Sequence, residues 1–268
     1  MIANGRMYSV TPAAAADWKT LLREVYRRAG VAGDVIDYPA PAPLEALWRR
    51  ADLAGVFMCG LPFSLGLFPV VAIVAPVPLH SLPDGPGSYR SRLIVARDAP
   101  YRQLRDTFGG RLAFTNPESH SGYSALRFHL LAYLRPGQTA LYRHTVGPLV
   151  TPRRVVEAVA GGDADIGPVD SYAWELLARD EPDLMGKVRV IDNTAPAPMP
   201  LLVASATLPP AALAALQRAF TTLSRDENGA ALLAALRLQG FRIPDPADYR
   251  LLAQRAAAAE QAGYRLLG

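Results

Sequence analysis

The chain has 268 residues, of which 50% are hydrophobic and 19% are charged, so it can form a packed core of one large domain or of two lobes, and global disorder is excluded. Its net charge of +4 is carried almost entirely by arginine and includes no dense basic run, which argues against a nucleic-acid-binding protein. The single cysteine, Cys59, excludes an intrachain disulfide, and no apolar run is long enough for a membrane span.

Strands and helices are predicted to alternate along the first third of the chain. The helix over residues 11–30 has clear ends, with Thr11 as its cap, Pro12 in its first turn and Gly30 just past its last turn. Residues 76–90 are rich in proline and glycine and are predicted to form a loop. The other predicted elements of this block are strands at 5–10, 35–39, 53–63 (running into a tight loop) and 68–77, and a short helix at 42–52.

A second block repeats this alternation. Its predicted strands are 89–98, 111–115, 139–146, 164–170 and 187–192, and its predicted helices are 123–134, 151–162 and 171–180. A proline-rich segment then precedes a last strand at 201–205, and the tail after Pro209 is predicted to be almost entirely helical. Alternation of this kind argues for an α/β protein with largely parallel sheets, in two blocks at about 1–88 and 90–190.

One polar segment, residues 115–122, lies between a predicted strand and a predicted helix. Backbone N–H groups at a helix N-terminus have no intrahelical partner, and the helix dipole favours negative charge there. Ser119, His120 and Ser121 add side-chain donors. Gly122 removes a Cβ at the point where a ligand would come closest. The segment therefore has the features of an anion site, although a serine cap with a glycine-assisted turn explains the same residues.

Other candidates lie at predicted strand ends, where ligands gather in open α/β sheets. His144 is predicted near the end of its strand and could face the same cleft, although a lone histidine is more often structural. Asp170 either caps the next helix or lines the cleft with Tyr172. Cys59 has no histidine or aspartate near it in the sequence and is expected to be a core residue. No cofactor motif, zinc-type spacing or catalytic set is present, so no cofactor, metal or catalytic residue is expected.

Three segments follow one another in the order RLAFTNPESHSGYSALR, RHTVGPLVTPRRVVEAVAGGDADIGPVDSYAWELL and NTAPAPMPLLVAS. Over about residues 5–240 the chain thereby resembles the substrate-binding proteins of phosphate, phosphite and phosphonate ABC transporters, which have the type 2 periplasmic-binding-protein fold. The resemblance implies two lobes, each a mostly parallel sheet flanked by helices. Lobe one would comprise residues 1–88 and 195–268, and residues 89–194 would form an inserted lobe two. Two crossing segments, near Tyr89–Ala96 and Ile191–Pro200, would act as the hinge.

The resemblance also implies a ligand site. The family's ligand-binding positions correspond to Ser119, Ser121, Gly122, His144, Asp170, Tyr8 and Tyr89. The turn residues and the histidine would hold the oxygens of a phosphonate, the two tyrosines would close over the ligand, and the aspartate would bind an amine substituent. His120 stands where the family has a threonine, and it either adds a cation or narrows the pocket. If either histidine must be cationic, binding should weaken above neutral pH.

The expected function is that of a solute-binding protein that closes two lobes around a small oxyanion for an ABC-type transporter, with a permease as partner. The expected ligand is phosphate, phosphite or a phosphonate. The N-terminus lacks a secretory signal, so the protein is either cytoplasmic or periplasmic with a trimmed start. Two alternatives stay open for a leaderless chain of this fold. One is a cytoplasmic enzyme resembling a menaquinone-pathway dehydratase or a thiamine-precursor synthase, and the other is a cytoplasmic ligand sensor.

Overall fold

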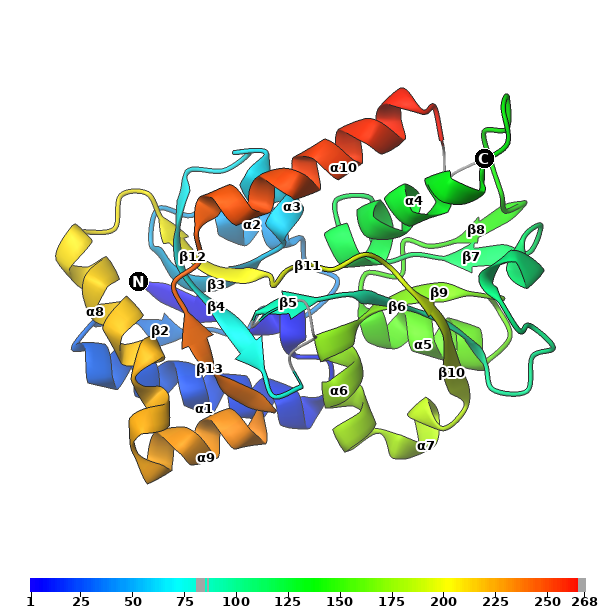
Figure 1. The fold of residues 1–268 in the computed structure, drawn as a ribbon. Helices are drawn as coiled ribbons and strands as arrows, with labels where there is room; N and C mark the ends of the chain where they lie inside the picture. The colour runs from blue at the N-terminus through cyan, green and yellow to red at the C-terminus, as the bar shows by residue number, and fades with distance from the viewer. Residues whose placement is uncertain (81–84, 86, 265–268) are drawn as a thin grey trace. The chain divides into compact units, whose positions relative to one another are not determined.

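The computed structural model describes residues 1–80, 85 and 87–264, so part of the predicted loop at 76–90 lies outside the described residues. The chain divides into two compact units (Figure 1). The first unit comprises Met1–Ser88 and Pro198–Arg250, and the second comprises Tyr89–Ala197 and the chain from Leu251 onward. Each unit contains β-strands flanked by α-helices, which is the predicted α/β class.

The first unit is built on a six-stranded sheet in the order β13-β4-β12-β3-β1-β2. The pairs β1–β2 and β1–β3 are parallel, whereas β12 runs antiparallel to β3 and β4, and β13 runs antiparallel to β4. The sheet is therefore mixed: β1, β2, β3 and β4 run in one direction, and the two strands from the C-terminal part of the chain, β12 and β13, run against them. The strands are β1 (Ile2–Asn4), β2 (Asp34–Val35), β3 (Leu53–Met58), β4 (Val70–Pro78), β12 (Leu201–Ser205) and β13 (Leu238–Arg242).

The helices of this unit are α1 (Pro12–Ala29), α2 (Leu44–Trp48), α3 (Gly60–Ser64), α8 (Pro210–Thr221) and α9 (Glu227–Ala235). Helix α1 has its predicted ends, since Thr11 Oγ1 accepts a hydrogen bond from the Ala14 N–H and Gly30 adopts a left-handed conformation with φ of 63°. Helix α1 contacts α8 and α9, and α8 and α9 also contact β13 (Figure 1). Trp18 of α1 packs edge-on against Phe57 of β3 at 4.9 Å between ring centroids, which joins this helix layer to the sheet.

Two predicted strands of the first unit are placed differently in the structure. The first strand is β1, and the residues predicted as strand at 5–10 instead include a 3₁₀ turn, Arg6–Tyr8. Asn4 initiates this turn, because its side-chain oxygen accepts a hydrogen bond from the Arg6 N–H at 2.7 Å. The strand predicted at 53–63 ends at Met58, and the residues around Pro62 form the short helix α3.

The second unit contains the antiparallel sheet β10-β6-β9 and a parallel pair, β7–β8. These strands are β6 (Ser91–Ala96), β7 (Arg111–Ala113), β8 (His144–Val146), β9 (Gly167–Asp170) and β10 (Val188–Asn193). Its helices are α4 (Ala125–Leu130), α5 (Pro152–Ala160), α6 (Ser171–Asp180), α7 (Pro182–Met185) and α10, which begins at Arg250 and ends at Gln261. Four of these strands run in one direction, because β7 is also bridged in parallel to Ile166, just before β9, and β6 alone runs against them.

The C-terminal helix α10 belongs to the second unit from Leu251 onward, whereas the sequence-based division assigned residues 195–268 to lobe one. Side chains on α4 hold it there: the Arg127 guanidinium forms an ion pair with Glu260 at 2.7 Å and donates a hydrogen bond to the Tyr264 carbonyl at 2.7 Å. The Tyr264 ring is buried in the same core as Leu126 and Leu130. The chain therefore passes between the units three times. At the first two passages β5 (Ser88–Tyr89) and β11 (Ala197–Pro198) pair with each other.

Candidate functional site

The polar turn that follows β7 is capped by Ser119. The Ser119 Oγ accepts a hydrogen bond from the Gly122 N–H at 3.0 Å. One π-helical turn, His120–Ser124, then runs directly into α4. The helix cap that the sequence left open as an alternative is therefore present, and Ser119 forms it.

Ser121 has a different environment within the same turn. Its carbonyl oxygen accepts a hydrogen bond from the Ser91 hydroxyl at 2.8 Å, which ties the turn to the first residue of β6. The Ser121 hydroxyl itself forms no hydrogen bond with any residue that the structure describes. The turn thus contains one serine that completes the local fold and one serine whose hydroxyl has no protein partner among the described residues.

Gly122 is required by packing. A Cβ at this position would lie 1.8 Å from Thr115 Oγ1 and 2.8 Å from Thr115 Cβ. The Gly122 carbonyl also accepts a hydrogen bond from the Thr115 N–H at 3.3 Å. The absent Cβ therefore makes room for Thr115 at the start of the turn, and the expected approach of a ligand to Gly122 stays a prediction.

His120 is buried, with 1% of its surface exposed, and its ring lies edge-on to the Tyr89 ring at 6.3 Å between centroids. Burial, together with the positive charge of Arg255, lowers the pKa of His120 to about 3. The imidazole is consequently neutral at pH 7. Of the two roles considered for His120, the structure favours filling of space over addition of a cation.

Asp170 lies close to the turn in the sheet, because it pairs in register with Ser91 between β9 and β6. Its Oδ1 accepts hydrogen bonds from the backbone N–H groups of Tyr172 at 2.8 Å and Ala173 at 3.0 Å. The capping interpretation of this residue is thus realised at the start of α6. Tyr172 is also buried, with 1% of its surface exposed.

Two further predicted site residues belong to other elements. The prediction that His144 lies near the end of its strand is wrong, because β8 begins at His144, and the residue is paired in register with Arg111, the first residue of β7. The turn leaves β7 at the other end of that strand, and the His144 side chain is exposed. Tyr8 belongs to the first unit, where it is buried edge-on against Phe57 at 5.0 Å between ring centroids.

Sequence reasoning missed two residues beside the turn. Ser91 gave no signal in the sequence, because its contacts with Ser121 and with Thr194 join segments far apart in the chain. Arg255 lies in the alanine-rich tail, for which the sequence predicts only a helix. Its guanidinium donates a hydrogen bond to the Pro196 carbonyl at 2.7 Å and lies 5.6 Å from the centroid of the Phe128 ring.

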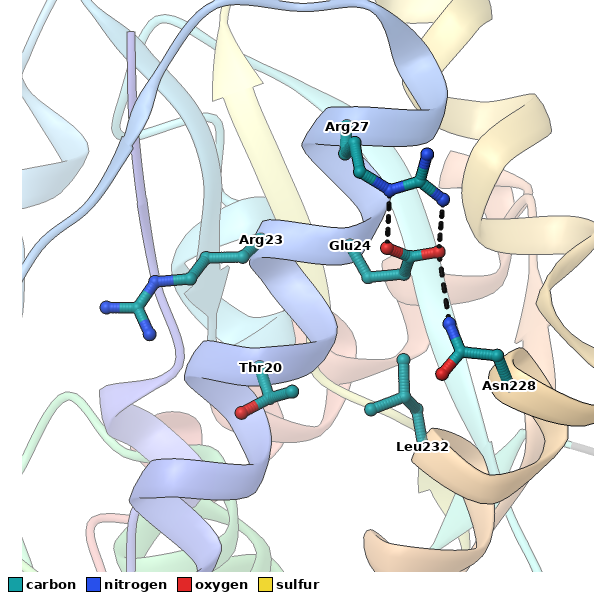
Figure 2. A pocket seen from close by; sticks show the side chains of 6 residues that line it. All are labelled: Thr20, Arg23, Glu24, Arg27, Asn228 and Leu232. Carbon is teal, nitrogen blue, oxygen red and sulfur yellow. Dashed lines mark hydrogen bonds and ion pairs between the residues drawn. The ribbon is translucent and has the colours of Figure 1, made fainter.

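The first unit contains a groove between α1 and α9 with a volume of about 270 Å³ (Figure 2). Its lining residues are Thr20, Arg23, Glu24, Arg27, Asn228 and Leu232. Figure 2 shows the Glu24 carboxylate between Arg27 and Asn228, with Arg23 pointing away from it. The arginine hydrogen bonds lower the pKa of Glu24 to about 2, so the carboxylate is ionised and offsets the arginine charge. None of the predicted site residues lines this groove.

No cluster of three His, Cys, Asp or Glu side chains that could bind a metal occurs among the residues described. Cys59 is buried, in agreement with its expected place in the core. In the part of the chain covered by the structure, no helix has both the length and the apolar character needed to cross a membrane.

Comparison with known proteins adds a family and a fold. A family model described as "ABC transporter, phosphonate, periplasmic substrate-binding protein" matches residues 56–249. No curated protein matches the chain. A binding protein component of an ABC phosphonate transporter from Pseudomonas aeruginosa is 17% identical, with 100% of this chain and 90% of that chain covered and a TM-score of 0.80.

PhnD1 from Prochlorococcus marinus MIT 9301, solved in complex with methylphosphonate, is 14% identical, with coverage of 97% and 98% and a TM-score of 0.80. A Xanthomonas citri protein bound to ATP is 20% identical, with coverage of 98% and 97% and a TM-score of 0.67. At these identities the likeness shows the fold alone. The predicted periplasmic-binding-protein fold is thereby confirmed.

Proposed function

The chain belongs to the phosphonate family of ABC-transporter periplasmic substrate-binding proteins, and from this premise we propose that it binds a small phosphorus oxyanion at the turn between Ser119 and Gly122. The class of ligand is phosphate, phosphite or a phosphonate. The family consists of periplasmic binding proteins, and the comparisons give the enzyme alternative no support. We further propose that this chain delivers its ligand to an ABC permease from the periplasm.

The observation that carries the proposal is the contrast between the two serines of the turn. Ser119 is engaged as the helix cap, whereas the Ser121 hydroxyl has no partner among the described residues. A half-buried hydroxyl donor at the start of a helix suits an anionic oxygen, because the orphan N–H groups and the helix dipole favour negative charge there. Ser91 holds the Ser121 backbone in place, so the donor is preorganised.

The energetics of such a site are adequate for a transport protein. Hydrogen bonds to charged groups contribute about 1.5–3 kcal/mol each. Several of them together supply the roughly 8 kcal/mol that corresponds to micromolar affinity. The participation of Tyr8, Tyr89 and Asp170, and closure of two lobes around the ligand, stay predictions from the family resemblance.

A thermal-shift panel on the purified chain tests the proposal. The panel contains phosphate, phosphite, methylphosphonate, 2-aminoethylphosphonate, sulfate and several carboxylates, including chorismate. A ligand present at 100 times its Kd adds about 2.7 kcal/mol of stability, which raises Tm by roughly 5–10 °C for a chain of this size. We expect such a shift with at least one phosphorus oxyanion. A shift with a carboxylate alone would contradict the proposal and favour an enzyme.

A further inference from the structure

Arg255 is a half-buried cation to which the function described above assigns no role. Its guanidinium uses one N–H group to bind the Pro196 carbonyl, and its charged face lies over the Phe128 ring. No carboxylate among the described residues lies within ion-pair distance of it. Glu260 on the same helix is paired with Arg127 instead. Arginine has five donors, so most of the hydrogen-bonding capacity of Arg255 is unused.

Leaving this charge without an anion is unfavourable. Burial removes water from the guanidinium and lowers the pKa of Arg255. Partly buried arginines are ordinarily found paired with carboxylates or phosphates, whose geometry matches the planar fork of the guanidinium. Arg255 is therefore a partly buried cation with no anionic partner among the described residues.

The place of Arg255 in the fold associates it with the polar turn. Helix α10 lies along α4, which is the direct continuation of the turn, and Arg127 and Phe128 of α4 both contact α10. Pro196 immediately precedes β11, which pairs with β5, and the β5 residue Tyr89 packs on His120. The charge of Arg255 also acts on His120 itself.

We propose that Arg255 supplies the positive charge of the oxyanion site, acting with the Ser121 hydroxyl on the same bound anion. This inference rests on the proposed function and deepens it. Because arginine stays protonated at every physiological pH, the site carries a fixed cation that does not depend on a histidine. The planar guanidinium also suits a ligand with at least two oxygens on one centre, a class that includes phosphate, phosphite and phosphonates as well as sulfate and carboxylates.

The test measures the affinity of the full chain for inorganic phosphate, phosphite and methylphosphonate by isothermal titration calorimetry. The variants are Arg255→Gln, which removes the charge, Arg255→Lys, which keeps it, and Arg250→Gln, which removes an exposed arginine from the same helix. We expect at least a tenfold loss of affinity for Arg255→Gln, a smaller loss for Arg255→Lys, and a change of less than twofold for Arg250→Gln. If Arg255→Gln does not fold, Arg255→Met replaces it, because methionine keeps an apolar stem against Phe128.

Measuring Tm with and without ligand separates a ligand-binding role of Arg255 from a purely structural one. A purely structural arginine would lower Tm without ligand but leave the Tm increase on adding ligand intact, whereas we expect that increase to shrink in Arg255→Gln. Wild-type affinity in a folded Arg255→Gln would overturn the role of Arg255 and leave the proposed function standing. Absence of binding by the wild-type chain to every phosphorus oxyanion would overturn the proposed function and this inference with it. Binding of sulfate alone, lost in Arg255→Gln, would support Arg255 as the anion's cation and overturn the phosphorus class.

Discussion

The arginines near the end of α1 and the single arginine Arg255 of α10 differ in one respect, which is whether a carboxylate is bound to the guanidinium. In the first unit Arg27 and Arg28 of α1 both bind Glu24, and Arg28 also forms two hydrogen bonds with Asp226 at 2.6 and 2.9 Å. In the second unit Arg255 has only a carbonyl oxygen and an aromatic ring as partners among the described residues.

The difference separates arginines that hold the fold from an arginine that is available to a ligand. The cluster of Arg27, Arg28 and Glu24 joins α1 to α9, because its partner Asp226 is the N-cap of α9. Asp226 also accepts a hydrogen bond from the Gly229 N–H at 2.9 Å. The charges of this cluster are balanced internally, so an added anion gains little there. Around Arg255 and the polar turn, in contrast, the Arg255 guanidinium has no carboxylate partner and the Ser121 hydroxyl has no hydrogen-bond partner among the described residues.

The largest expected effect comes from Gly122→Ala, which disrupts the turn and leaves the α1–α9 cluster intact. The new Cβ would meet Thr115 Oγ1 at 1.8 Å, and rotation of that side chain cannot relieve the contact with Thr115 Cβ at 2.8 Å. We expect the free energy of unfolding to fall by about 3 kcal/mol or more, at the upper end of overpacking effects, together with loss of anion binding.

Urea denaturation measures this loss. The matched control is Gly240→Ala, because a Cβ at Gly240 meets no atom within 4 Å, and we expect a change below about 0.5 kcal/mol. Equal stability of the two variants would show that the packing of the turn on Thr115 is not as described.

Ser121→Ala tests the ligand side of the comparison. Because this hydroxyl has no partner among the described residues, its removal should leave stability nearly unchanged. We expect affinity for the oxyanion to fall by about 1–3 kcal/mol, which is roughly 5- to 150-fold. Calorimetry beside an exposed-serine control, Ser224→Ala, measures the difference. Unchanged affinity in Ser121→Ala would remove this residue from the site.

The burial of His120 leads us to expect that the free energy of unfolding of the second unit depends on pH. Burial lowers the pKa of His120 from 6.5 to about 3, so below pH 6.5 the unfolded chain binds a proton that the folded chain does not. Stability is therefore lost as the pH falls from 6.5 towards 3, by up to about 1.4 kcal/mol per pH unit. Urea titrations between pH 7 and 4 should show this slope in the wild type and a flatter curve in His120→Gln. Parallel curves would mean that His120 is not buried in its neutral form.

Affinity should respond to pH differently from the expectation based on a cationic histidine. With His120 neutral and Arg255 charged throughout, we expect no loss of affinity between pH 7 and 8.5 after correction for ionisation of the ligand itself. Calorimetry in buffers of matched ionic strength measures this. A tenfold loss over that range would restore a histidine as the cation of the site.

The smallest effect expected of any substitution on stability and affinity together is that of Glu24→Gln in the balanced cluster. Pairs near the surface contribute at most about 1 kcal/mol each, so we expect a comparable loss of stability at pH 7 and no change in anion affinity. The arginines lower the pKa of Glu24 from 4.5 to about 2, so its contribution is complete above pH 4.5 and is lost as the pH falls to about 2. Wild type and variant should therefore converge in urea denaturation at low pH. A weakened affinity in Glu24→Gln would contradict the assignment of this cluster to structure.

The features that the sequence predicted correctly are the local ones. The cap at Thr11 and the left-handed Gly30 depend on neighbouring residues alone, so the ends of α1 were predictable. The cap at Ser119 was also predictable, as one of two interpretations of its turn. The family resemblance supplied the fold, which alternation of strands and helices alone placed only in the α/β class.

The features that failed depend on contacts between distant segments. The residues near β12 in the chain do not indicate that β12 pairs antiparallel with both β3 and β4. The contacts of Arg255 with Pro196 and Phe128 form only when α10 packs on the second unit. The packing of Gly122 on Thr115 could not be predicted for the same reason, because Thr115 comes close only when the turn folds back on β7.

The most direct test of the central claim is a calorimetric titration of the wild-type chain with methylphosphonate at pH 7, followed by phosphate, phosphite and sulfate. We predict saturable one-to-one binding of at least one phosphorus oxyanion with a Kd on the order of micromolar. Failure of all three phosphorus oxyanions to bind a folded chain would contradict the account of the turn as an oxyanion site.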